Sequence, residues 1–199
     1  MALKTLVKVG KISNLSDARY CAGMSVDMLG FSVISGRDHY VSPELFKEMR
    51  GWFTGPSIVT EIYGIEKHED LAAIIQTYLP DLIEGSFSDI KKLHSAYASY
   101  ILSTTYEEVK AHENELGIYR TQIAYLIIPE STPLEQIEAL SREYKLLLQI
   151  DSTNPEDSKL HNEHIKGIAL QGSAEDKPGL KNYDALATVL EKLEAELCH

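Results

Sequence analysis

The stretch Val7-Lys8-Val9-Gly10-Lys11-Ile12-Ser13-Asn14-Leu15-Ser16-Asp17-Ala18 decides the fold class of this chain. Its first half is rich in valine and isoleucine, as in a buried β-strand. Asn14 then precedes a segment with helical spacing, and asparagine is a favoured residue at the N-cap of a helix. The stretch therefore predicts a strand that turns directly into a helix, which is the repeating unit of α/β proteins.

The alternation of strand and helix continues to the end of the chain. The predicted strands are short apolar segments that mostly lack polar alternation, as in strands covered on both faces. They span residues 6–12, 28–34, 57–63, 81–84, 100–104, 122–128, 145–150 and 165–170. The predicted helices span residues 15–23, 43–52, 67–79, 88–98, 107–116, 133–143 and 182–197. Ser42-Pro43 predicts a capped helix start, and Thr132-Pro133-Leu134-Glu135 predicts a capping box.

Eight strands, each followed by a helix or a short connection, predict an α/β fold of the (β/α)8 TIM-barrel type. With 199 residues the barrel would be of minimal size, and we expect residues 1–199 to form a single domain. An open doubly wound sheet is the alternative, because periodicity does not reveal whether a sheet closes. No Gly-x-Gly-x-x-Gly motif follows a strand, so we expect no dinucleotide, and we predict no other cofactor.

The charge and cysteine content restrict the partners and the location. A net charge of −11 disfavours nucleic acid and membranes as partners, whereas a small anionic ligand would need a local positive site. Cys21 and Cys198 form neither a disulfide framework nor a metal cluster, and Cys21 is predicted to pack in the core. The start of the chain lacks the apolar run of a signal peptide, so we predict a cytoplasmic protein.

Four groups of residues form an ordered series of motifs. The first is the opening stretch, and the others are Leu29-Gly30-Phe31 with Tyr40-Val41-Ser42-Pro43-Glu44, then Asn154-Pro155-Glu156, then Pro178-Gly179-x-Lys181-Asn182-x-Asp184. The series resembles the phosphoribosylanthranilate isomerase family, whose opening pattern reads Lys-(Val/Ile)-Cys-Gly-(Ile/Leu)-Thr-Asn-x-x-Asp-Ala. The resemblance implies a TIM barrel of tryptophan biosynthesis that catalyses the Amadori rearrangement of an aminoaldose phosphate.

The resemblance also implies a catalytic cysteine and a catalytic aspartate. The cysteine aligns with Gly10 and the aspartate with Ile128. The Gly-Gly of the family's phosphate loop aligns with Asp151-Ser152, and its arginine near the substrate carboxylate aligns with His39. Because glycine and isoleucine cannot transfer a proton, we predict that the isomerase activity is weak or lost.

Polar residues at the carboxyl ends of the predicted strands define a candidate site, because TIM barrels build their active sites there. These residues are Lys11, His39, Glu61, Glu84, Asp151 and Gln171. Glu84 and Asp151 are the catalytic candidates, since two carboxylates could transfer protons or hold a divalent cation. They could instead be solvated or paired with Lys11 and Arg37.

The ligand-binding candidates are Lys11, His39, Ser152, Gly172 and Ser173. His161 and His164 lack the His-Glu-x-x-His spacing, so no metal site is predicted.

These observations predict an isomerase-like barrel that binds a small anionic metabolite, such as a sugar phosphate, at the carboxyl end of its strands. One alternative is an active isomerase with displaced acid and base groups, for which Glu130 is a candidate acid. Another is a non-catalytic interaction protein. Either a monomer or a homodimer fits the sequence.

Overall fold

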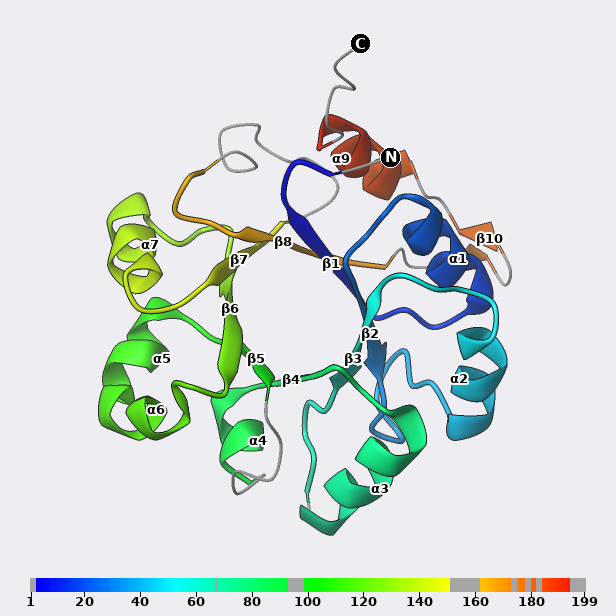
Figure 1. The fold of residues 1–199 in the computed structure, drawn as a ribbon, viewed down its shortest axis with the longest axis horizontal. Coiled ribbons are helices and arrows are strands. Elements are labelled where there is room, and N and C mark those ends of the chain that lie inside the picture. Colours follow the sequence, from blue (N-terminus) through cyan, green and yellow to red (C-terminus); the bar gives the residue numbers. More distant parts are fainter. Residues whose placement is uncertain are drawn as a thin grey trace.

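Eight parallel strands form a closed barrel in the computed structural model, which describes residues 3–66, 68–92, 99–150, 162–172, 175–177, 180–181 and 184–193 (Figure 1). The strands are β1 (Leu6–Gly10), β2 (Met28–Ser32), β3 (Ser57–Glu61), β4 (Leu82–Gly85), β5 (Tyr100–Ser103), β6 (Ile123–Pro129), β7 (Leu146–Gln149) and β8 (Gly167–Gln171). Neighbours in sequence pair with each other, and β8 pairs with β1. This closure confirms the TIM barrel and rules out the open sheet.

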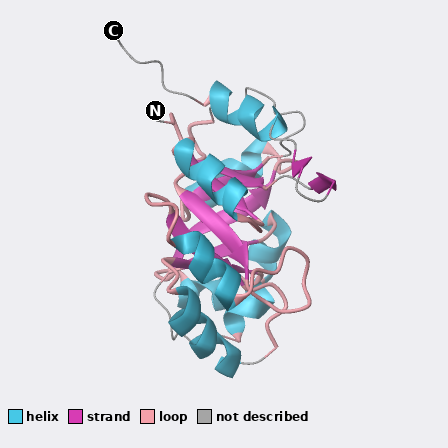
Figure 2. Ribbon diagram, turned by 90° about the vertical axis from the view of Figure 1, so that its right-hand side faces the viewer, coloured by secondary structure: helices cyan, strands magenta, loops and turns pink. Residues whose placement is uncertain are grey.

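The helices lie around the outside of the barrel (Figures 1 and 2). They are α1 (Leu15–Gly23), α2 (Pro43–Arg50), α3 (His68–Tyr78), α4 (Phe87–Lys91), α5 (Tyr106–Ala111), α6 (Glu113–Tyr119), α7 (Leu134–Ser141) and α9 (Asp184–Lys192). A separate antiparallel pair consists of β9 (Glu175–Lys177) and β10 (Leu180–Lys181). Within the described ranges, no helix has the length and apolar character needed to cross a membrane.

The barrel strands contribute to two apolar cores. The larger core lies between the strands and the helices and includes Val7 and Val9 of β1. The smaller core fills the inside of the barrel and consists of Met28, Val59, Ile101, Ile127, Leu147 and Ala169. Because successive residues of a strand point to opposite faces, Lys8 and Gly10 of β1 face the inside. A lysine therefore lies within the barrel, near the carboxyl ends of its strands.

Side-chain caps begin several helices, as the sequence predicts. The Asn14 side chain accepts a hydrogen bond from the Asp17 backbone N–H at 2.9 Å and thereby caps α1. Ser42 caps α2 in front of Pro43. The predicted capping box at residues 132–135 was wrong: α7 begins at Leu134, and Pro133 stands at its N-cap without a side-chain hydrogen bond. Proline has no side-chain acceptor, so that helix starts uncapped.

The predicted helix over residues 107–116 is in fact two helices, α5 and α6. His112 separates them because its backbone leaves the helical region, with φ −117° and ψ 20°. The imidazole of His112 packs on the ring of Phe87 from α4, with 4.8 Å between the ring centroids. The break therefore coincides with a contact between neighbouring helices, which helical periodicity alone does not reveal.

A substitution at Gly167 tests the close contact between β8 and β1 that closes the barrel. A Cβ atom added there would lie 2.1 Å from the carbonyl oxygen of Leu6 on β1, and backbone cannot yield as a side chain can. We expect Gly167→Ala to lower the free energy of unfolding by about 1–3 kcal/mol, measured by urea denaturation. Gly117→Ala in α6 is the matched control, because a Cβ atom there meets nothing within 4 Å. It should be neutral or stabilise the protein by up to about 1 kcal/mol. Equal stability of the two variants would contradict this view of the β1–β8 seam.

Candidate functional site

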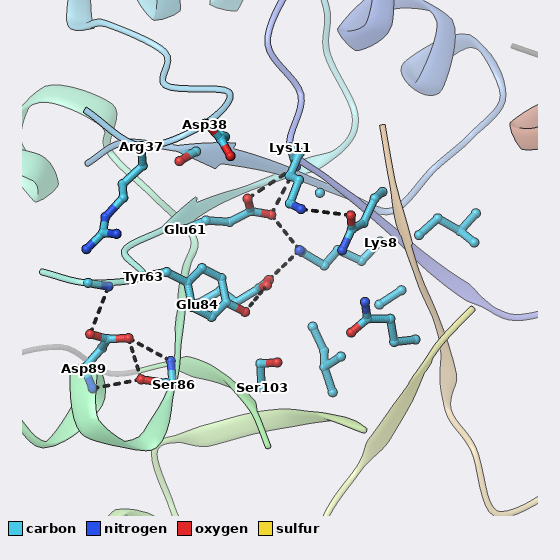
Figure 3. A pocket seen from close by; sticks show the side chains of 18 of the residues that line it. Lys8, Lys11, Arg37, Asp38, Glu61, Tyr63, Glu84, Ser86, Asp89 and Ser103 are labelled. Carbon is cyan, nitrogen blue, oxygen red and sulfur yellow. Dashed lines mark hydrogen bonds and ion pairs between the residues drawn. The ribbon is translucent and has the colours of Figure 1, made fainter. Parts of the chain in front are cut away.

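A cavity of about 730 Å³ opens at the carboxyl ends of the barrel strands. Residues from all parts of the barrel line it, including the inward-facing Lys8, Glu61 and Glu84 (Figure 3). The position agrees with the location of active sites in TIM barrels. The described lining contains four basic residues, Lys8, Lys11, Arg37 and Lys92, and four acidic residues, Asp38, Glu61, Glu84 and Asp89.

The floor of the cavity is a buried charged cluster of Lys8, Glu61 and Glu84, each at most 4% exposed. The ammonium group of Lys8 donates a hydrogen bond to Glu61 Oε1 at 2.8 Å. It also lies 2.5 Å from Glu84 Oε2, in an ion pair that lacks hydrogen-bond geometry. β1, β3 and β4 each supply one member, and the parallel register aligns Glu61 with Glu84 on adjacent strands. One lysine thus faces two carboxylates.

Burial and the neighbouring charges together set the pKa values of Lys8 and Glu84. Burial alone would lower the pKa of Lys8, but the charges of Glu61 and Glu84 outweigh it and raise that pKa above its usual value. Lys8 therefore stays protonated and is unsuited to act as an amine nucleophile. Burial raises the pKa of Glu84, and the nearby charge of Glu61 adds to the effect, while Lys8 partly offsets it. Glu84 thus retains a proton to higher pH than an ordinary glutamate side chain does.

Tyr63 extends the cluster toward the opening of the cavity. Although the residue is 37% exposed, its hydroxyl donates a hydrogen bond to Glu84 Oε1 at 2.7 Å. Burial of the hydroxyl raises the pKa of Tyr63, and the charge of Glu84 raises it further. Tyr63 therefore remains a neutral hydrogen-bond donor across the physiological pH range.

Two glycines make room for Glu61. A Cβ atom on Gly10 would lie 2.5 Å from Glu61 Oε1 and 2.8 Å from Lys8 Nζ. A Cβ atom on Gly30 would lie 2.2 Å from the same Glu61 oxygen and 3.0 Å from the Cα atom of Gly10. The carboxylate of Glu61 therefore occupies the place that a side chain at position 10 would take.

Two further cations stand at the rim. Lys11 donates from its ammonium group to Gln171 Oε1 at 2.9 Å, and its backbone N–H lies 3.3 Å from both carboxylate oxygens of Glu61. Its φ of 55° is in the left-handed region, at the position where the isomerase pattern has glycine. Arg37 lies over Gly64, where an added Cβ atom would come within 2.3 Å of its Nη2 atom.

The loop that carries Arg37 is folded back onto the end of β2. Ser32 bridges Tyr40, and the Val41 backbone N–H donates to the Ser32 carbonyl at 2.8 Å. The tip of the loop therefore stands at the cavity (Figure 3). Among the described residues, no hydrogen bond or ion pair engages the guanidinium group of Arg37. Within the described part of the chain, Arg37 is thus a cation at the site without an acidic partner.

Asp89 organises the opposite wall, and its carboxylate is already engaged. It accepts hydrogen bonds from the backbone N–H groups of Gly64 and Ser86, both at 3.1 Å, and forms a capping box with Ser86 at the start of α4. Lys92 lies 3.9 Å from it and donates to the Ile65 carbonyl at 2.7 Å. These contacts fix the wall and leave little hydrogen-bonding capacity for a ligand.

The structure brings together only part of the predicted site. Glu84, Glu61, Lys11 and Gln171 line the cavity. Glu84 pairs with Lys8, and not with Lys11 or Arg37 as the alternative had it. His39, with φ 59°, does not line the cavity.

The remaining predicted site residues are Gly172, Asp151, Ser152 and Ser173, of which only Gly172 is described. The backbone N–H of Gly172 donates to the Gly10 carbonyl at 2.8 Å, so that amide is already satisfied. The predicted residues Asp151, Ser152 and Ser173 lie outside the described residues, as do Cys198 and His161. The pairing of Glu84 with Asp151 therefore stays a prediction.

Lys8 is a residue of the candidate site that sequence reasoning missed. It was part of the opening stretch but was not singled out, although it is the one charged residue in an otherwise apolar strand. Alternation along β1 places it on the same face as Gly10, which could have indicated its inward position.

The residues at the aligned catalytic positions carry no acid or base. Ile128 belongs to the outer core, while its neighbour Ile127 faces the cavity. Glu130, the candidate displaced acid, is not among the residues that line the cavity. Cys21 is buried in the outer core, as predicted. Across the described part of the chain, no group of three or more histidine, cysteine or acidic residues could hold a metal ion.

Solved structures of phosphoribosylanthranilate isomerases share this fold. The enzyme from Thermotoga maritima is 17% identical with a TM-score of 0.73, over 95% of this chain and 98% of that chain. The enzyme from Thermus thermophilus is 15% identical with a TM-score of 0.71, over 94% and 98%. An orotidine 5'-monophosphate decarboxylase from Methanocaldococcus jannaschii is 10% identical with a TM-score of 0.64, over 98% and 100%. No protein-family model and no curated protein matches the sequence. The chain thus has the fold of phosphoribosylanthranilate isomerase, and identities this low establish the fold alone.

The close approach of Glu61 to Gly10 can be measured as a coupling between the two residues. We expect Gly10→Ala to lower the free energy of unfolding by about 1–3 kcal/mol, because the new methyl group displaces Glu61 from Lys8. In a Glu61→Ala background the same change should cost clearly less, in a double-mutant cycle followed by urea denaturation. Gly23→Ala is the control, since a Cβ atom there meets nothing within 4 Å. Equal costs in both backgrounds would refute the steric coupling.

Proposed function

We propose that this protein is a phosphoribosylanthranilate isomerase-like barrel of the tryptophan-biosynthesis type whose isomerase activity is weak or lost. In this proposal it binds a small anionic metabolite, such as a sugar phosphate, at the carboxyl end of the barrel. The observation that carries the proposal is the cavity itself. It combines Arg37, which has no acidic partner among the described residues, with a floor where Glu61 fills the place of a catalytic side chain at position 10.

The loss of the isomerase reaction is supported by the chemistry of the aligned positions. Gly10 has no side chain, and both Ile127 and Ile128 are aliphatic, so neither partner of the implied acid–base pair is present. Removal of one general acid or base typically costs about 10²–10⁴-fold in rate. The absence of both groups is therefore expected to reduce the activity severely.

The local charge supports an anionic ligand. The whole chain carries a net charge of −11, yet basic and acidic residues are equal in number along the described lining of the cavity. The acidic members are largely engaged: Glu61 and Glu84 by Lys8, and Asp89 by backbone donors and Lys92. Arg37 and Lys11 have no acidic partner among the described residues, so a ligand with negative charge would be attracted to the rim.

Two of the similar structures support the same class of ligand. A phosphoribosylanthranilate isomerase with 16% identity and a TM-score of 0.72 is in complex with reduced 1-(o-carboxyphenylamino)-1-deoxyribulose 5-phosphate. The orotidine 5'-monophosphate decarboxylase is in complex with the inhibitor BMP. The first of these compounds carries both a phosphate and a carboxylate. A sugar phosphate is therefore a suitable first probe for the cavity.

Binding of D-ribulose 5-phosphate tests the proposal, with D-ribulose as the uncharged reference. We expect the phosphate ester to bind in isothermal titration calorimetry and to raise the melting temperature, and D-ribulose to bind much more weakly. Arg37→Ala should weaken binding about tenfold, the effect of roughly 1.4 kcal/mol, because a charged hydrogen bond is removed. Arg19→Ala is the matched control, since Arg19 is exposed on α1 and does not line the cavity. The proposal fails if the phosphate ester does not bind, or if both arginine variants bind it as the wild type does.

Complementation tests the predicted loss of the isomerase activity. We expect the protein to give no growth above background in a tryptophan auxotroph that lacks phosphoribosylanthranilate isomerase. Immunoblotting must show soluble protein at a level comparable to that of an active isomerase used as the positive control. Growth at the rate of the positive control would instead support the alternative of an active isomerase with displaced acid and base groups.

A further inference from the structure

The buried cluster places a carboxylate where the barrel would otherwise carry a side chain from β1. Glu61 Oε1 lies 2.5 Å from the position that a Cβ atom on Gly10 would take, so the functional group enters from β3 and not from β1. Two donors contact this carboxylate: the Lys8 ammonium at 2.8 Å and the Lys11 backbone N–H, which lies 3.3 Å from each oxygen. These donors hold the carboxylate of Glu61 at the floor of the cavity.

The second carboxylate has the opposite environment. Glu84 is also buried, with one oxygen in an ion pair with the Lys8 ammonium at 2.5 Å, but its other oxygen accepts from the neutral hydroxyl of Tyr63 and not from a backbone N–H. One ammonium ion can balance one carboxylate in full, so burial of the second favours its protonated form. Environments that differ in this way separate a base from an acid within one pair of carboxyl groups.

We propose that Glu61 and Glu84 form a proton-transfer pair that acts on a small anionic hydroxycarbonyl compound in the cavity, with Glu61 as base and Glu84 as acid. Lys8 is the positioning residue between them. The inference rests on the proposed function, because it requires that the cavity binds such a compound.

The step balances without any further reactant. Glu61 removes a proton from the carbon next to the carbonyl group, and the electron pair of that C–H bond forms a carbon–carbon double bond. The carbonyl π bond opens toward its oxygen, and this oxygen takes the proton of Glu84, which gives an enediol. Glu61 then gives its proton to the former carbonyl carbon, and Glu84 takes the proton of the hydroxyl group on the neighbouring carbon. The carbonyl group thereby moves by one position, both carboxyl groups return to their starting forms, and the overall change is an isomerisation with no net oxidation or reduction.

Lys8 suits both stages of this step. Before the transfer it faces an ionised Glu61 and a protonated Glu84, and afterwards it faces a protonated Glu61 and an ionised Glu84. The three groups carry no net charge in either arrangement, so the low-dielectric floor has no uncompensated charge to accommodate. Both carboxylates are within ion-pair distance of the same nitrogen, at 2.8 Å and 2.5 Å.

The first test needs no ligand and concerns the proton on Glu84. A raised pKa means that the folded protein holds this proton at pH values where the unfolded chain, with the ordinary value of 4.5, has lost it. The free energy of unfolding should therefore fall as the pH rises above about 4.5, and Glu84→Gln should lack this part of the slope. Urea denaturation between pH 4.5 and about pH 8 measures it. Glu135→Gln, an exposed substitution on α7, should keep the wild-type slope. Equal slopes for wild type and Glu84→Gln would overturn the assignment of the acid.

The second test measures proton removal by Glu61, the proposed base. In D₂O, the wild type should incorporate deuterium into D-ribulose 5-phosphate, observed by ¹H NMR. Glu61→Gln should reduce the exchange rate by about 10²–10⁴-fold and leave calorimetric binding within about threefold of the wild type. Glu61→Asp is the second variant: it keeps the charge that Lys8 requires but withdraws the carboxylate by one methylene group, and it should also lose exchange. Glu135→Gln should exchange as the wild type does.

The outcomes separate this inference from the proposed function. Binding of D-ribulose 5-phosphate without exchange, or wild-type exchange by a folded Glu61→Gln or Glu61→Asp variant, overturns the proton-transfer pair and leaves the binding function intact. If D-ribulose 5-phosphate does not bind, both the proposed function and this inference are overturned. Exchange that depends on Glu61 together with a slope that depends on Glu84 supports the pair.

Discussion

The ammonium group of Lys8 imposes the constraint on which the carboxyl end of this barrel depends. A buried charge without a partner is costly by several kcal/mol, so a lysine inside a barrel must be balanced by acids that are also inside. Glu61 and Glu84 meet this requirement from β3 and β4, with atoms 2.8 Å and 2.5 Å from the nitrogen. The register of the strands aligns Glu61 with Glu84, and Tyr63 and the Lys11 backbone contribute further hydrogen bonds.

This constraint extends to positions that carry no charge. The carboxylate of Glu61 fits only because Gly10 and Gly30 leave their inner faces empty. The absence of a side chain at position 10 is thus one part of an arrangement in which β3 supplies the polar group that lies there. The unusual feature of Gly10 is what lies beside it, and that neighbour is 51 positions away in the sequence.

The sequence predicted the barrel well because its strands are continuous apolar segments and its first helices have strong caps. Asn14 and Ser42 cap α1 and α2 through local hydrogen bonds that residue type and position suffice to predict. The break at His112 was not predictable in the same way, since it accompanies packing on Phe87 from another helix. The strand predicted over residues 6–12 ends earlier, at Gly10, where Lys11 adopts a left-handed backbone that propensity does not favour for lysine.

The site was predictable in its location and only partly in its partners. Alignment of strand ends correctly placed Glu61, Glu84, Lys11 and Gln171 at the cavity. The ion pairs of Glu84 were not predicted, because they depend on which residues of β1 face inward in the closed barrel. Gly10 illustrates the consequence for the history of such a chain. Since a side chain at position 10 and the carboxylate of Glu61 compete for one space, a chain that has already lost the carboxylate at position 61 accepts a side chain at position 10 more easily than this one does.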